Sequence, residues 1–163
     1  MRCAHPVPGR RLPQTLGVEG TRLLPPTTMT NTKETAAKWT AFIADRPEFP
    51  AGERLLEALR AGEITRLCDC GCNAFDLTVP KDSGVKPISK TGGYGSVFEI
   101  SFEARGEGPP NNQGSLEFIV FADNQGHLSG IEVDFCGNSY PIPNSLEVAS
   151  APYHVRCSAA IDA

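Results

Sequence analysis

The chain has 163 residues, of which 40% are hydrophobic and 21% are charged, a composition typical of one globular domain with its own core. Residues 29–163 carry 11 basic and 18 acidic side chains, and this net charge of −7 argues against a nucleic-acid partner, because phosphate binding needs clustered Lys and Arg. No apolar run approaches the ~20 residues that a membrane span needs, so we expect no membrane partner.

Residues 1–28 are basic, rich in proline and without periodicity. This segment is unlike a secretory signal, which needs an apolar segment. It is also unlike a transit peptide, because its prolines would break the amphipathic helix that such peptides form. Without a signal, the six cysteines indicate reduced thiols and a cytoplasmic protein. We expect residues 1–28 to be either a disordered arm or a leader that is absent from a native chain beginning at Met29, and we favour the leader. A single domain is expected over 29–150, followed by a loosely held tail over 151–163.

Two helices are predicted at the start of the domain. Asn31 and Glu34 have the spacing of a capping box, and four apolar residues then recur at helical spacing up to about residue 45, namely Ala36, Trp39, Phe42 and Ile43. A second helix is expected to begin near Pro50 and to end at Gly62, with an apolar side formed by Leu55, Leu56 and Leu59.

From Ile64 onward the hydrophobic period changes to two, which is typical of strands. Strand candidates cover residues 64–68, 74–79, 96–104, 115–122, 127–135 and 146–149. Short polar turns such as 123–126 separate them, and such turns favour antiparallel pairing. The predicted fold is α+β, with two N-terminal helices packed on one face of a mainly antiparallel sheet of about five strands and the other face in solvent.

The solvent face of this sheet is predicted to be acidic, because apolar and acidic residues alternate along its longest strands. Like charges on neighbouring strands repel each other, and a cationic protein partner that docks there would relieve the repulsion. We therefore predict a binding surface for a basic protein, in which five carboxylates surround two apolar side chains: Glu99, Glu103, Glu117, Ile119, Phe121, Glu132 and Asp134. The alternative is an acidic surface that only maintains solubility.

Three cysteines alternate with other residues in the sequence CDCGC, namely Cys68, Cys70 and Cys72. On a strand these thiols would face one side, and Cys136 or His127 could complete a tetrahedral zinc site. Paired zinc ligands usually have two residues between them, so we favour thiols that simply fill the core over a metal site. Asp69 disfavours a third interpretation, a reactive thiol, since activation needs positive neighbours.

No catalytic residue is predicted. No serine lies in a Gly-x-Ser-x-Gly sequence, and no histidine has a partner at metalloprotease spacing. The glycine-rich residues 91–96 precede a strand rather than a helix, so they indicate a turn and not a phosphate-binding loop. An enzyme is therefore not the expected class.

Residues 126–134 (GHLSGIEVD) and 137–143 (GNSYPIP) resemble a strand-turn pattern in small uncharacterised bacterial proteins, including immunity proteins encoded beside polymorphic toxins. The resemblance implies an inhibitor that binds a toxin domain and has no catalytic residues. Two functions are therefore carried forward. One is a non-catalytic protein-binding module, of the immunity type if the resemblance holds, and the other is a zinc-binding domain or small metalloenzyme that uses the three clustered cysteines.

Overall fold

The structure is a computed structural model that describes residues 28–161. The predicted leader therefore lies outside the described residues, apart from Thr28, which pairs with Pro143. Met29 donates a backbone hydrogen bond to the carbonyl of Ile142 at 2.7 Å. The first described residues thus lie beside a loop that is distant in the sequence.

Two helices follow, α1 (Lys33–Ala44) and α2 (Gly52–Ala61), and they end within one residue of the predicted positions. The N-cap of α1 is Thr32 and not Asn31, because the Thr32 hydroxyl accepts a hydrogen bond from the Thr35 N–H at 3.2 Å. Asn31 instead uses its side chain in longer-range contacts. α2 begins after Pro50, at Gly52.

Seven strands form one sheet, in the order β1-β2-β5-β4-β3-β6, with β7 also paired to β3. Their bounds are β1 (Glu63–Leu67), β2 (Phe75–Thr78), β3 (Gly95–Arg105), β4 (Gln113–Ala122), β5 (Leu128–Phe135), β6 (Glu147–Val148) and β7 (His154–Cys157). All pairings between these strands are antiparallel. The class predicted from the sequence, α+β with an antiparallel sheet, is confirmed.

The number of strands is higher than predicted, and the difference lies mainly at one edge of the sheet. β7 falls in residues 151–163, which were expected to be a loose tail, but it pairs with β3 from Phe98 to Ser101. The pairing extends further through a hydrogen bond from the Ser158 N–H to the Val97 carbonyl at 2.8 Å. The tail prediction is wrong for these residues, because an edge strand with four exposed side chains carries no apolar alternation.

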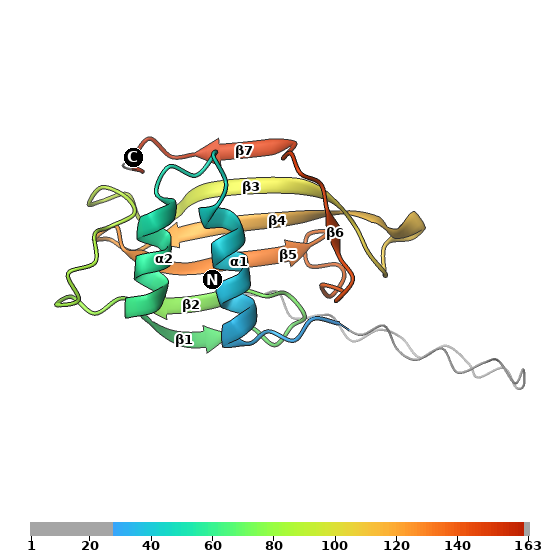
Figure 1. Ribbon diagram of the computed structural model, residues 1–163, viewed down its shortest axis with the longest axis horizontal. Coiled ribbons are helices and arrows are strands. Elements are labelled where there is room, and N and C mark those ends of the chain that lie inside the picture. The colour runs from blue at the N-terminus through green and yellow to red at the C-terminus, as the bar shows by residue number, and fades with distance from the viewer. Residues whose placement is uncertain (1–27, 162–163) are drawn as a thin grey trace, which may run out of the picture.

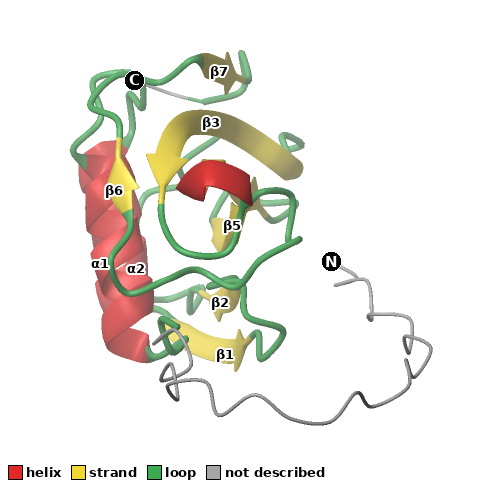
Figure 2. Cartoon of the chain, turned by 90° about the vertical axis from the view of Figure 1, so that its right-hand side faces the viewer, coloured by secondary structure: helices red, strands yellow, loops and turns green. Residues whose placement is uncertain are grey.

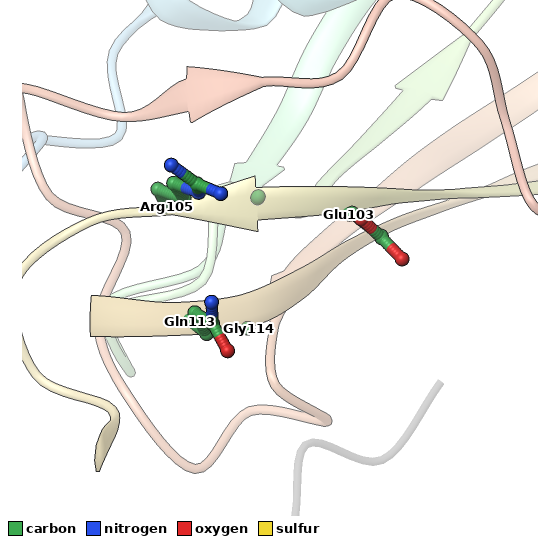
Figure 3. Close-up of a pocket in the computed structure, with 5 residues that line it drawn as sticks. Glu103, Arg105, Gln113 and Gly114 are labelled. Carbon is green, nitrogen blue, oxygen red and sulfur yellow. The ribbon is translucent and has the colours of Figure 1, made fainter. Parts of the chain in front are cut away.

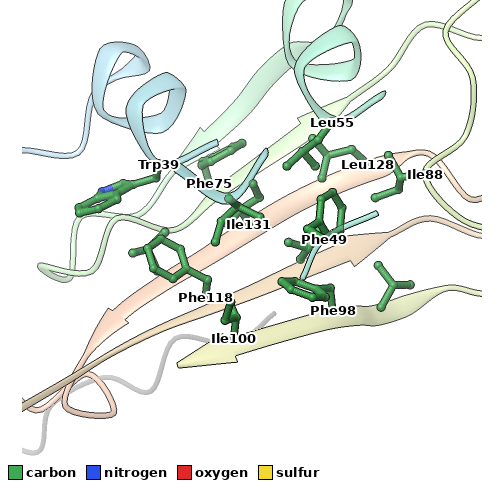
Figure 4. Packing of buried hydrophobic residues seen from close by; sticks show 14 of the residues in the cluster. Trp39, Phe49, Leu55, Phe75, Ile88, Phe98, Ile100, Phe118, Leu128 and Ile131 are labelled. Carbon is green, nitrogen blue, oxygen red and sulfur yellow. The ribbon is translucent and has the colours of Figure 1, made fainter. Parts of the chain in front are cut away.

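The core lies between the helices and one face of the sheet. α1 and α2 lie side by side across the strands (Figure 1), and a perpendicular view shows them as a separate layer (Figure 2). Trp39 of α1 packs against Phe118 of β4 with ring centroids 5.5 Å apart, and Phe49 packs against Phe98 of β3 at 4.9 Å (Figure 4). No α-helix of residues 28–161 covers the opposite face of the sheet, here called the outer face.

Candidate metal centre

The three clustered cysteines lie in the loop between β1 and β2 rather than on a strand. Their sulfur atoms nevertheless converge. The Sγ atoms of Cys68 and Cys70 are 2.8 Å apart, and those of Cys70 and Cys72 are 3.0 Å apart. All three sulfurs lie within 4.8 Å of one another, and none is in a disulfide. We call these three residues the thiol cluster.

Backbone contacts fix this loop at its base, its tip and its side. The Cys68 N–H donates to the Ala74 carbonyl at 2.9 Å, which closes the base. At the tip, Gly71 has a φ of +101°, a conformation that favours glycine, and its carbonyl accepts from the Ile142 N–H at 3.2 Å. The Asn73 N–H donates to the Val133 carbonyl of β5 at 3.0 Å. The chain therefore brings the three sulfurs together without using a sulfur in any of these contacts.

Two asparagine side chains join the loop to the helical layer. The Asn31 Nδ2 donates to the carbonyls of Cys68 and Ala74, at 3.0 and 2.8 Å, and so bridges both ends of the loop. The Trp39 Nε1 of α1 donates to the Asn73 Oδ1 at 2.9 Å. Two polar atoms of these asparagines are left over: the Asn31 Oδ1 and the Asn73 Nδ2 are buried and have no hydrogen-bond partner in the described part of the chain.

The surroundings of the thiol cluster disfavour a free thiolate. Cys68 and Cys72 are buried, with 7% and 3% of their surface exposed, whereas Cys70 is exposed. Burial raises the pKa of the Cys72 thiol far above its usual range, and hydrogen bonding with Cys70 raises this pKa further. A backbone hydrogen bond with Ala74 lowers the pKa of Cys72, while the nearby Cys68 raises it, and the net effect is upward. A bound cation would reverse this effect, because a thiol that coordinates a metal is deprotonated.

The fourth ligand predicted from the sequence does not lie with this cluster. Among residues 28–161, the group of side chains whose ligand atoms lie close enough together to hold a metal ion consists of the three cysteines. Cys136 lies beyond β5 instead, in a turn where its φ is +56°, and His127 lies in the turn before β5. The spacing predicted that three thiols would lie together, but it gave no information on how distant cysteines approach in space.

The predicted acidic surface lies on the outer face, since its residues alternate with those that face the helices. Glu99, Ile119 and Glu132 lie opposite one another on β3, β4 and β5, and Glu117 lies directly opposite Asp134. The strand register therefore brings these residues together, as the sequence predicted.

Two of these carboxylates are already bound within the molecule. The Arg156 Nε of β7 donates to the Glu99 Oε2 at 2.9 Å, and hydrogen bonds from Arg156 are the main reason why the pKa of Glu99 falls to about 2. Asp134 is only 6% exposed, and its Oδ1 accepts from the Gly137 N–H at 2.9 Å. The prediction of free, solvated carboxylates at these two positions is wrong, because the pairing of β7 and the turn after β5 were not foreseen.

Glu117 is in a different environment. Burial raises the pKa of its carboxyl group, and the negative charges of Asp134 and Glu99 raise it further. Burial likewise raises the pKa of Asp134, against the lowering effect of its backbone hydrogen bonds. Glu117 and Asp134 thus form a pair of like-charged groups that are both partly removed from water.

Comparison with known proteins adds no relative. The chain matches no family model. No curated protein and no solved structure matches it either. The resemblance of residues 126–143 to immunity proteins therefore stays a prediction, and the function has to be argued from the geometry. In the described part of the chain, no helix is both long and apolar enough to cross a membrane.

Two cavities adjoin the residues discussed above. One, of about 410 Å³, lies where β3 ends and β4 begins, and Glu103, Arg105, Gln113 and Gly114 line it (Figure 3). The other, of about 440 Å³, lies between residues 28–31 and the loop of the thiol cluster. Of these two cavities, only the second is lined by candidate metal ligands, namely Cys68 and Cys72.

Proposed function

We propose that this domain binds one thiophilic metal ion, zinc, through Cys68, Cys70 and Cys72. The observation that carries this proposal is the convergence of three sulfurs in a loop that backbone hydrogen bonds and the Asn31 side chain hold in place. Thiolate sulfur is a preferred ligand of zinc, and a site built from one short loop needs little rearrangement to accept the ion.

The distances between the sulfur atoms fit a zinc site in which the sulfurs move slightly apart when the ion binds. Sulfurs that share one tetrahedral zinc ion stand about 3.8 Å apart, given Zn–S bonds of about 2.3 Å. The distances of 2.8 and 3.0 Å are shorter than this by about 1 Å, and longer than the ~2.05 Å of a disulfide bond. Rotation of the side chains can supply the difference, since the loop backbone is held independently.

Core packing explains the thiol cluster less well than metal binding does. Cys68 and Cys72 form a small buried cluster with Ala74, separate from the main core, so they add little to the contacts between the helices and the sheet. Cys70 is exposed and yet lies against both neighbours. Since a thiol is only a weak hydrogen-bond donor, three sulfurs gain little from contacting one another without a cation.

The test compares the zinc content of three full-length chains: the wild type, Cys72→Ser, and Cys157→Ser as a control that removes an exposed thiol on β7. Each is equilibrated with one equivalent of Zn²⁺, dialysed and analysed for metal. One zinc per chain is expected in the wild type and in Cys157→Ser. Cys72→Ser should bind at least about 100-fold more weakly, because even changes outside the ligand set cost 10–100-fold. A wild-type chain without zinc, or a Cys72→Ser chain with unchanged zinc, contradicts the proposal.

We propose as a second function that the outer face binds a basic protein partner, of the kind that an immunity-type inhibitor would meet. The specific observation that favours it is the like-charged pair of Glu117 and Asp134, with Glu132 on the neighbouring strand and the partly exposed Ile119 and Phe121 beside them. A cationic side chain from a partner would relieve the repulsion, and the apolar side chains would supply contact area.

The second function is tested by calorimetric titration with a lysine-rich peptide as the probe. Reversal of charge in Glu117→Lys/Glu132→Lys is expected to abolish binding that the wild type shows at low salt. Glu53→Lys/Glu57→Lys is the control, because it makes the same change in net charge on α2, on the other side of the sheet. Equal loss of binding in both double variants would show that only net charge matters and would contradict a specific surface.

A further inference from the structure

The thiol cluster supplies three protein ligands, whereas zinc in proteins is usually four-coordinate. We propose that the fourth position of the bound ion faces the cavity beside the cluster and holds a water molecule, and that this water donates a hydrogen bond to the Asn31 Oδ1. This inference rests on the metal-binding function proposed above. It deepens that function, because it makes the site an open one.

The cavity indicates on which side of the thiol cluster the fourth coordination position lies. Cys68, Gly71 and Cys72 line the 440 Å³ cavity together with residues 28–31. A water molecule occupies about 30 Å³ of liquid, so the cavity holds a ligand larger than water as well. Space next to the sulfurs on this side allows a fourth ligand to enter without displacing the chain.

Asn31 supplies the independent evidence for a water ligand. Its two amide N–H groups are both used, on the carbonyls of Cys68 and Ala74, and this pattern also fixes which side-chain atom is the oxygen. Its Oδ1 is a buried acceptor without a donor. The buried Asn73 Nδ2 is the other unpartnered polar atom of the two asparagines. Buried polar atoms are nearly always hydrogen-bonded, and because Asn31 is among the residues that line the cavity, a ligand bound there can supply the donor that its Oδ1 lacks.

To pair with the Asn31 Oδ1, the fourth ligand of the metal ion must carry a hydrogen atom that it can donate. This requirement distinguishes water from a thiolate. Water keeps its O–H groups on a metal ion and donates more strongly there than in bulk, because the cation polarises it. A thiol loses its proton when it coordinates a metal, so a fourth thiolate would leave the Asn31 Oδ1 without a partner. The side chain therefore favours water over a fourth cysteine, whether from this chain or from a small-molecule thiol.

The test uses the full-length chain loaded with Co²⁺ in place of zinc, because the visible spectrum of Co²⁺ reports its ligands. Imidazole is the probe, since it is a neutral donor that the three thiolates do not repel. We expect imidazole to shift the ligand-field bands in a saturable way, while the sulfur-to-cobalt charge-transfer intensity stays at the level of three thiolates. This outcome would show an exchangeable fourth position.

The Asn31→Ala variant then tests the hydrogen bond to water. The variant also loses the N–H groups that bond to the carbonyls of Cys68 and Ala74, so its affinity for Co²⁺ is expected to fall. Once it is loaded with one Co²⁺, it should take imidazole about three- to tenfold more tightly, since one ordinary hydrogen bond to the competing water is lost. Thr30→Ala is the control on the same wall of the cavity, and its affinity for imidazole should not change. A merely structural role of Asn31 would change the affinity for Co²⁺ and not the affinity for imidazole.

The outcomes separate this inference from the proposed function. A wild-type chain that binds no Co²⁺ at all contradicts the metal-binding function and, with it, the open site. A chain that binds Co²⁺ with three thiolates but shows no response to imidazole overturns the open site alone. Charge-transfer intensity of four thiolates, or its reduction in Cys3→Ser or Cys136→Ser, also overturns the open site, because the fourth ligand is then a protein side chain.

Discussion

Glu117 lies on β4 directly opposite Asp134, and the two acidic groups share a partly buried position on the outer face. Carboxylates in such a position are usually separated or paired with a base, since like charges opposite each other on a sheet destabilise it. The nearest bases do not remove this conflict. Arg156 is engaged with Glu99, and the charge of His154 lowers the pKa of Glu117 less than burial and the neighbouring carboxylates raise it.

Replacement of Glu117 by Gln should therefore stabilise the protein at neutral pH. Because the pKa of Glu117 is raised above 4.5 in the folded state, the charged form destabilises the fold, and this effect appears as the pH rises through the folded-state pKa. We expect the free energy of unfolding at pH 7 to rise by about 0.5 kcal/mol, and the gain to vanish below pH 4.5. Urea unfolding across this pH range measures it, with the exposed Glu103→Gln as the control. A gain that is equal at all pH values would contradict the electrostatic cause.

At the scale of elements, β7 depends on few side chains. All four of its residues are exposed, so the pairing with β3 is held by the backbone and by the contacts of Arg156 with Glu99 and Ser96. An ion pair this exposed contributes modestly to stability, at most about 1 kcal/mol. The pair nevertheless neutralises one of the outer-face carboxylates, that of Glu99.

Arg156→Gln should loosen β7 in a way that depends on pH. The pKa of Glu99 is lowered from 4.5 to about 2, so the stabilising contribution of the pair is present above pH 4.5 and is lost as the pH falls towards 2. The variant is expected to lose about 0.5–1 kcal/mol at pH 7 and nothing near pH 2. Hydrogen exchange of the β7 amides at both pH values measures the effect. Unchanged protection of β7 at pH 7 would show that the backbone pairing alone holds the strand.

The elements that sequence predicted well are those with a strong apolar period. β3 is an example, because Phe98, Ile100 and Phe102 alternate with polar residues and are all fully buried against the helices. β6 lies within the strand candidate at 146–149, whereas β7 was missed, since a fully exposed strand leaves no period to detect.

The candidate site was predictable only in part. The spacing of Cys68, Cys70 and Cys72 indicated a possible metal site, but their convergence depends on contacts from Val133 and Ile142, which are far away in the sequence. The same holds for Asn31, whose local pattern indicated a helix cap while its side chain bonds to the loop instead. Local patterns predict local partners, and this site is assembled by distant ones.

Over the whole molecule, the thiol cluster connects the two layers. Its loop joins β1 to β2, receives contacts from β5 and residue 142, and is bonded to α1 and the segment before it through Asn73 and Asn31. An ion that holds this loop in one conformation would therefore stabilise the helix and the sheet together. Metal occupancy and folding are expected to be coupled.

Removal of metal should lower the melting temperature of the whole domain. A ligand present at about 1,000 times its Kd stabilises the folded state by about 4 kcal/mol, which corresponds to about 8–16 °C for a domain of this size. We expect a fall of this order when EDTA is added to the zinc-loaded chain, measured by differential scanning calorimetry. The Cys72→Ser chain should show no change on chelation. An identical melting temperature for the wild type with and without EDTA would mean that the ion does not contribute to folding.

The hydrogen bond between Trp39 and Asn73 has a practical consequence. The chain contains one tryptophan, and its indole N–H is bonded to the residue that follows Cys72. Indole emission depends on that hydrogen bond, so a metal ion bound at the thiol cluster would be expected to change the intrinsic fluorescence of the native protein. Metal uptake and release can then be followed in real time at micromolar concentrations without any label.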